Sequence, residues 1–162
     1  MISFDPFKKE NLFYKYKIKI TEEEFQQIKI LIRHKKYINP LNSSTYFTLN
    51  ILNFPMLKNV KKQITDILEE HDLVLGNSWA QYYNTNNSHS VHIHEVAKKS
   101  GIIYLCSKGS PTIFYSRTFE EYENKIEKNT LILFPSFIPH EVKPLSKDEE
   151  RLVLSFNAMY NF

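Results

Sequence analysis

The sequence predicts a mainly β protein, a β-sandwich or barrel flanked by two supporting amphipathic helices. From residue 73 onward, apolar and polar residues alternate with the period of strands, and turn-forming residues separate most of the runs. Two earlier segments carry the longer period of a helix. The 162 residues contain no internal repeat or low-complexity linker, which indicates one domain. Residues 1–72 would supply strands and supporting helices, and residues 73–162 the main β-structure.

The amino-terminal part begins with a strand. In residues 12–20, apolar or aromatic residues alternate with three lysines, the pattern of a half-buried strand. The alternating residues are Tyr14, Tyr16, Ile18 and Ile20. Lysines suit an edge strand because their charge discourages pairing with another chain. We therefore expect this strand near the edge of a sheet.

Two helices are expected next, with a strand over residues 45–52 between them. Thr21 and Glu24 have the spacing of a capping box, which marks the start of the first helix. Its apolar stripe consists of Phe25, Ile28, Leu31 and Ile32. The second helix spans about residues 55–70, and Pro55 suits its first turn.

The remaining chain predicts seven short strands. They cover residues 74–83, 89–95, 101–106, 111–116, 130–134, 139–143 and 151–158. The polar segment 118–128 lies between two of them, and we interpret it as a long loop or short helix that could cover the mouth of a site.

Composition and charge exclude several classes of protein. With 42% hydrophobic and 14% aromatic residues, the chain is not intrinsically disordered. The net charge of +3 arises from 21 basic and 18 acidic residues, a balance that does not favour a nucleic-acid surface. Cys106 is the single cysteine, so an intrachain disulfide is impossible and a reducing compartment is expected. The sequence shows no secretory signal and no apolar run long enough to cross a bilayer, so we expect a cytoplasmic protein without a membrane partner.

Three histidines form the candidate metal site. His92 and His94 are two residues apart on an expected strand, so their side chains share one face. His140 follows a buried strand and a turn, which would place it at the rim of the core. Three imidazoles are suitable ligands for iron, zinc or copper. The alternative is a pair of exposed histidines on a surface strand, with no metal.

The other three histidines are not assigned to the site. His34 and His71 fall late in the two expected helices, where the helix dipole favours a histidine, and we interpret both as structural. His89 lies three residues before His92, and in a regular strand this odd spacing would place the two side chains on opposite faces.

Arg151 begins the last expected strand. Alternation places it on one face with Val153, Ser155 and Asn157. A guanidinium buried without a partner is costly, so it must meet an anion, and its planar shape suits a carboxylate. The anion could be a carboxylate ligand or one of the acidic residues in 148–150.

These residues together resemble a known family. The matching pattern is His92-x-His94, then Ser100-Gly101-Ile-Ile-Tyr104-Leu105, then Leu133-Phe134-Pro135-Ser136-x-x-x-His140-x-Val142-x-Pro144, then Arg151-x-x-x-Ser155-Phe156-Asn157. It is similar to the 2-oxoglutarate- and iron(II)-dependent oxygenases of marine bacteria and tailed phages, relatives of the prolyl 4-hydroxylases. The resemblance spans about residues 79–157.

The resemblance implies a fold and a set of site residues. The fold would be a double-stranded β-helix, the jelly-roll or cupin-like core, with iron held by His92, His94 and His140. Arg151 and Tyr104 would bind the distal carboxylate of 2-oxoglutarate, and Tyr83 would line the same pocket. His94 departs from the family because most members have Asp or Glu there.

The resemblance also implies the reaction. The chain would be a dioxygenase that uses Fe(II), 2-oxoglutarate and O2 to hydroxylate an unactivated C–H bond, with ascorbate as a candidate reductant. 2-Oxoglutarate would be decarboxylated to succinate. The substrate would be a protein, a peptide or a small molecule, with a prolyl residue as the first candidate. If phage-encoded, the enzyme would act in the host cytoplasm.

Two alternatives remain open at this stage. One is a cupin-type oxygenase or isomerase with a three-histidine metal and no 2-oxoglutarate, although Arg151 would then lack a partner. The other is a binding module on the same β-scaffold, without a metal.

Overall fold

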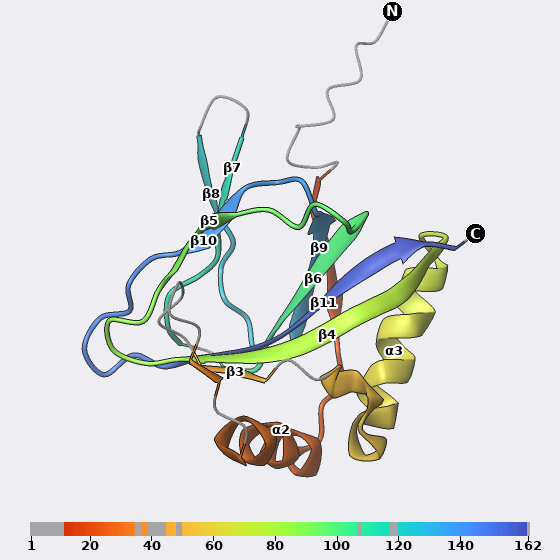
Figure 1. Ribbon diagram of the computed structural model, residues 1–162, viewed down its shortest axis with the longest axis horizontal. Helices are drawn as coiled ribbons and strands as arrows, with labels where there is room; N and C mark the ends of the chain where they lie inside the picture. The colour runs from red at the N-terminus through yellow and green to blue at the C-terminus, as the bar shows by residue number, and fades with distance from the viewer. Residues whose placement is uncertain are drawn as a thin grey trace, which may run out of the picture.

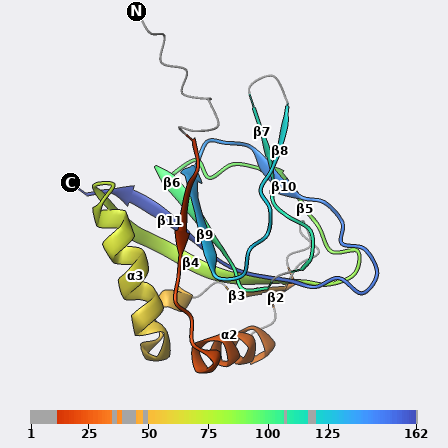
Figure 2. The ribbon, with the colours of Figure 1, turned by 180° about the vertical axis from the view of Figure 1, so that it is seen from behind.

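The computed structural model describes residues 12–34, 37–38, 45–47, 50–106, 108–116 and 120–161. The described residues form two antiparallel sheets and two α-helices. Figures 1 and 2 show both helices on one side of the larger sheet and the smaller sheet on the other side. Among these residues, no helix has the length and apolar character needed to span a membrane.

The larger sheet has seven strands. Their order is β1 (Tyr14–Lys17), β9 (Thr130–Pro135), β6 (Lys99–Tyr104), β11 (Arg151–Tyr160), β4 (Leu73–Tyr83), β3 (Thr45–Phe47) and β2 (Tyr37–Ile38). The expected edge position of the first strand is confirmed, because β1 pairs with β9 at one end of the sheet. The long central strands β4 and β11 pair from Arg151 opposite Tyr83 to Tyr160 opposite Leu73.

The smaller sheet has four strands. Their order is β5 (His89–His92), β10 (His140–Val142), β7 (Ile113–Tyr115) and β8 (Glu121–Glu123). Strands β5 and β10 are antiparallel, with His140 opposite His92 and Val142 opposite His89. The seven strands predicted after residue 73 are all present, with boundaries that differ by up to three residues.

The prediction for residues 118–128 was wrong in part. This segment contains β8, which pairs with β7 and is the outer strand of the smaller sheet; residues 118 and 119 lie outside the described part. Glutamate is depleted in strands, so two glutamates in three residues concealed it. Tyr122 between them is half-buried and packs against the apolar cluster between the sheets.

The helices are α2 (Glu22–His34) and α3 (Lys58–Glu69), the latter preceded by the short 3-10 helices η1 (Ile51–Asn53) and η2 (Pro55–Leu57). The capping box is confirmed: the Thr21 N–H donates to Glu24 Oε2 at 2.8 Å, and the Glu24 N–H donates to Thr21 Oγ1 at 3.1 Å. The strand expected over residues 45–52 is shorter, because only β3 is extended before η1; residues 48 and 49 are not described.

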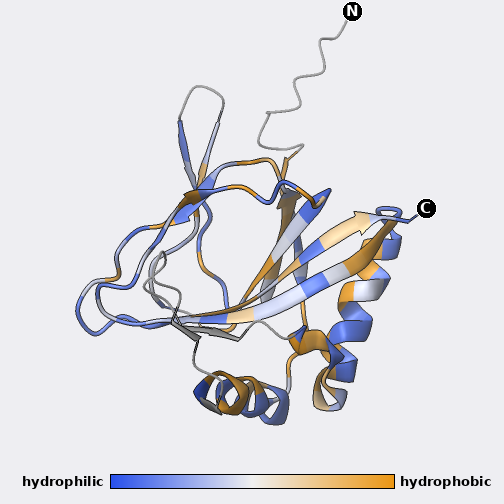
Figure 3. Ribbon diagram, in the orientation of Figure 1, coloured by the Kyte–Doolittle hydropathy of each residue, from blue (hydrophilic) through white to orange (hydrophobic). Residues whose placement is uncertain are grey.

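Apolar side chains pack on both faces of the larger sheet. On the outer face, Ile28 of α2 and Ile64 of α3 join residues such as Leu154 in one cluster. The hydrophobic side of α3 faces the sheet, and its hydrophilic side faces away (Figure 3). A second cluster lies between the two sheets and includes Phe114 and Phe134. Beside this second cluster, the inner face also carries polar side chains that line a cavity.

Gly101 shows how closely the central strands pack. A Cβ atom at this position would lie 2.2 Å from the ring of Phe156, on the neighbouring strand β11. Gly101→Ala should therefore lower the free energy of unfolding by about 1–3 kcal/mol through overpacking. Urea denaturation of the single variants and of Gly101→Ala/Phe156→Leu checks this. If the smaller side chain at 156 does not reduce the cost of the alanine, the steric explanation is wrong.

Candidate metal centre

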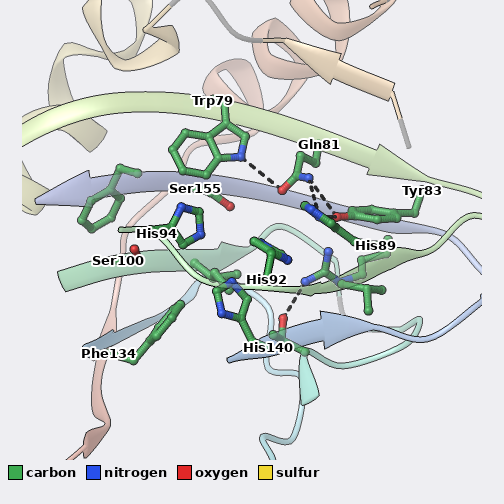
Figure 4. A pocket seen from close by; sticks show the side chains of 16 residues that line it. Trp79, Gln81, Tyr83, His89, His92, His94, Ser100, Phe134, His140 and Ser155 are labelled. Carbon is green, nitrogen blue, oxygen red and sulfur yellow. Dashed lines mark hydrogen bonds between the residues drawn. The ribbon is translucent and has the colours of Figure 1, made fainter. Parts of the chain in front are cut away.

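The three predicted ligands converge in the structure. His92 and His140 are paired across β5 and β10. His94 is not on the strand as expected, because β5 ends at His92; the N–H of His94 donates instead to the carbonyl of Ser136, after β9, at 2.9 Å. One ring nitrogen from each of the three lies within 4.8 Å of the others. Figure 4 shows the three rings turned toward one another in a cavity between the sheets. His140 is only 4% exposed, so it lies inside the core and not at its rim as expected.

Backbone carbonyls fix two of the rings. Nδ1 of His92 lies 2.8 Å from the carbonyl oxygen of Ser90, and Nδ1 of His140 lies 2.9 Å from that of Ile138. Because a carbonyl only accepts hydrogen bonds, Nδ1 carries the proton in each ring. Nε2 then has a free lone pair. In metal-binding histidines, the ring nitrogen that does not bind the metal commonly donates to a carbonyl in this way.

The charge state of the rings also suits a metal. Burial, followed by the repulsion of His92, lowers the pKa of His94 to about 4 and holds that of His140 well below its usual value. All three histidines have lowered pKa values, so near pH 7 they are neutral, the form that binds a metal ion. A set of three imidazoles fits iron, zinc or copper.

Arg151 is buried in the same cavity, at 1% exposure. Its Nη2 donates to Thr112 Oγ1 at 2.7 Å, whereas Nε and Nη1 have no hydrogen-bond partner among the described residues. The guanidinium lies 4.7 Å from the ring centre of Tyr83 and 5.5 Å from that of Tyr104. Within the described part of the chain, no acidic side chain lines this cavity.

The alternative of a salt bridge from Arg151 to the acids at 148–150 was wrong. Glu150 accepts a hydrogen bond from the hydroxyl of Tyr82, and Glu149 accepts one from the N–H of Ser146. No ion pair joins Arg151 to an acid within the described residues. Among the described residues, the buried cation therefore has no acidic counter-ion.

Tyr104 reaches Arg151 through Thr112. The Tyr104 hydroxyl donates to Thr112 Oγ1 at 3.0 Å and accepts from the Thr112 N–H at 3.0 Å. Thr112 Oγ1 thereby accepts from both Tyr104 and Arg151, which leaves its own O–H as a donor. Arg151, Thr112 and Tyr104 form one buried unit that offers hydrogen-bond donors.

The cavity residues that sequence reasoning did not assign to the site include Trp79, Gln81, His89 and Thr112. Trp79 and Gln81 share the inward face of β4 with Tyr83, so the alternation of that strand could have identified them. His89 could not be found this way. Between the paired positions, two residues of β5 (Ser90 and Val91) oppose one of β10 (Glu141), and this β-bulge returns His89 to the face of His92.

Comparison with known proteins supports the fold. No family model and no curated protein matches the sequence. Solved structures do match this protein, and they confirm that it has the double-stranded β-helix fold of the 2-oxoglutarate/Fe(II) oxygenases. One is a prolyl hydroxylase from Trichoplax adhaerens in complex with a hypoxia-inducible-factor peptide, with TM-score 0.70, 14% identity, and coverage of 91% of this chain and 84% of that one.

Two further structures have a similar level of agreement. A Pseudomonas putida prolyl-4-hydroxylase has TM-score 0.66 and 12% identity, and the match covers 93% of each chain. HygX of Streptomyces hygroscopicus, with nickel, 2-oxoglutarate and hygromycin B bound, has TM-score 0.68 and 8% identity, over 93% of this chain and 83% of that one. At these identities the likeness establishes the fold. The marine or phage origin stays a prediction.

Acid should destabilise the metal-free protein through these buried histidines. His94 has a pKa of about 4 in the folded state against 6.5 ordinarily, so below pH 6.5 the unfolded chain binds a proton that the folded protein excludes. The free energy of unfolding is therefore highest above pH 6.5 and falls as the pH drops toward 4. Urea unfolding at pH 7.5, 6.5 and 5.5 measures the slope. His94→Gln should reduce the dependence of the free energy of unfolding on pH. If the dependence is unchanged in this variant, the pKa of His94 is not lowered in the folded protein.

Proposed function

We propose that this protein is an Fe(II)- and 2-oxoglutarate-dependent dioxygenase that hydroxylates an unactivated C–H bond and converts 2-oxoglutarate to succinate. The observation that carries the proposal is the placement of a buried cation, Arg151, without an acidic partner in the cavity that also holds three converging histidines. The fold of the similar structures agrees with it.

The residues divide into two groups. His92, His94 and His140 would hold the iron through the ring nitrogens that lie within 4.8 Å of one another. Arg151 would bind the distal carboxylate of 2-oxoglutarate, with Thr112 and Tyr104 supporting it. When bound, iron would supply the activation of oxygen. The chain would contribute the orientation of the cosubstrate in the cavity.

The charges in the cavity support a dianionic cosubstrate. Three neutral imidazoles leave the charge of a divalent metal unchanged, and Arg151 adds one more positive charge. No acidic side chain of the described residues lines the cavity to offset these charges. Charges buried without partners are strongly unfavourable, so a ligand with two carboxylates fits this site better than a neutral one.

Both alternative functions account for less of the structure. A three-histidine metal enzyme without 2-oxoglutarate would use the same ligands but leave Arg151 without an anion. A metal-free binding module would not require His140 to be buried or the three ring nitrogens to converge. For the substrate, we propose a prolyl residue of a protein or peptide as the first to test, since two of the similar structures are prolyl hydroxylases.

Arg151→Met separates cosubstrate binding from metal binding. Loss of a buried charged partner should raise the Kd for 2-oxoglutarate about 100-fold. The same variant should raise the Tm of the metal-free protein, because it removes a buried cation that has no counter-ion. Anaerobic titration that follows the visible charge-transfer band of the iron–2-oxoglutarate complex measures the Kd, and calorimetry measures the Tm.

Arg33→Met is the matched control, because Arg33 is exposed on α2 and lies outside the metal cavity. It should leave both the Kd and the Tm close to those of the wild type. Equal Kd values for wild type and Arg151→Met would exclude Arg151 as the carboxylate-binding residue.

His94 is the ligand that most needs a direct test. His94→Leu removes a donor atom and should weaken Fe(II) binding at least tenfold. His94→Asp supplies a carboxylate oxygen in its place and should retain Fe(II) binding. Competition with a coloured chelator measures both affinities. If His94→Leu binds Fe(II) as tightly as the wild type, His94 is not a ligand.

A further inference from the structure

A chain of hydrogen bonds runs along the inward face of β4 and ends at His89. Trp79 Nε1–H donates to Gln81 Oε1 at 3.2 Å, and Gln81 Nε2–H donates to the Tyr83 hydroxyl at 2.9 Å. Gln81 Nε2 and the Tyr83 hydroxyl both lie beside His89 Nδ1, at 3.4 Å and 3.3 Å. Figure 4 shows these side chains grouped on one side of the three-histidine site.

This chain fixes the orientation of each group. An indole N–H only donates, so the atom of Gln81 that faces it is the oxygen and the other is the amide nitrogen. An amide N–H also only donates, so Nδ1 of His89 is an acceptor. The proton of the neutral His89 ring is therefore on Nε2, and the ring presents an N–H donor there.

The position of His89 lies between the two proposed parts of the site. Its ring stacks on that of His92, with 3.8 Å between ring centres and an interplanar angle of 9°. At its Nδ1 edge, the ring of His89 lies beside the hydroxyl of Tyr83, and the ring of Tyr83 packs against the Arg151 guanidinium. Burial, followed by the charges of His92 and Arg151, lowers the pKa of His89 to about 3. His89 lines the same cavity as the three histidines and Arg151, so a molecule bound there lies within the cavity that this imidazole borders.

We propose that His89 is a further cosubstrate-binding residue, which donates a hydrogen bond from Nε2–H to a carboxylate of 2-oxoglutarate. This inference rests on the proposed function and adds a residue to it. The β-bulge in β5 places His89 on the cavity side, and the β4 hydrogen-bond chain holds it in the donating tautomer. Trp79 and Gln81 are then positioning residues, since they act through His89.

Two substitutions separate the hydrogen bond from the ring stack. His89→Phe keeps a flat ring against His92 but removes both nitrogens. His89→Gln replaces the ring with an amide that can place an N–H near the position of Nε2. Val91→Ala is the control, because Val91 lies on the same strand with its side chain 53% exposed. Anaerobic titration gives the Kd of each protein for Fe(II) and, with Fe(II) bound, for 2-oxoglutarate.

His89→Phe should raise the Kd for 2-oxoglutarate about tenfold, the effect expected for one hydrogen bond to a charged group, and should leave the Kd for Fe(II) within about twofold. His89→Gln should restore 2-oxoglutarate binding to within about threefold of the wild type. An unchanged 2-oxoglutarate Kd in His89→Phe would overturn the proposal. An equal rise in both Kd values would also overturn it, since His89 would then act by supporting His92.

The outcome for the wild type distinguishes this inference from the proposed function. A wild-type protein that binds Fe(II) but not 2-oxoglutarate overturns both. A wild type that binds both, together with a normal His89→Phe variant, overturns only the role of His89. If His89→Phe does not fold, His89→Leu and His89→Gln replace it as the pair, and the same difference between them is expected.

Discussion

The burial of Arg151 is the constraint on which the interior depends. Its guanidinium has a hydroxyl and two aromatic rings around it, and no carboxylate among the described residues. The core must therefore remain rigid around an uncompensated charge. The long pairing of β11 with β4, and the apolar cluster on the outer face of the larger sheet, supply that rigidity. The outer face of this sheet packs against the helices, while the inner face carries residues of the candidate site.

Much of the fold followed from local patterns in the sequence. The capping box at Thr21, the apolar stripes and the strand alternation are short-range signals, and each had a matching element. Strand β8 was missed because two of its three residues are glutamates, which are depleted in strands, and its pairing with β7 is not a local signal. The division into two sheets, and which strands face each other, depends on contacts between distant residues that no local pattern encodes.

The site was predictable in part for the same reason. The convergence of His92 and His94 was predicted from their spacing, although β5 ends at His92 and His94 lies beyond it. Arg151 was noticeable as a charge in an apolar strand. The depth of His140 and the role of Thr112 in linking Arg151 to Tyr104 come from packing between strands. These relations were beyond the reach of spacing rules. Trp79 and Gln81, in contrast, alternate with Tyr83 and could have been read from the sequence.

The β-bulge in β5 makes the cavity sensitive to insertions and deletions during evolution. Substitutions alter one side chain, but the gain or loss of a single residue between His89 and His92 would turn His89 to the opposite face of the strand. The length of this four-residue strand is thus under as much constraint as its composition. In related chains, a one-residue insertion or deletion here would change which side chains line the cavity while leaving the surrounding sheet intact.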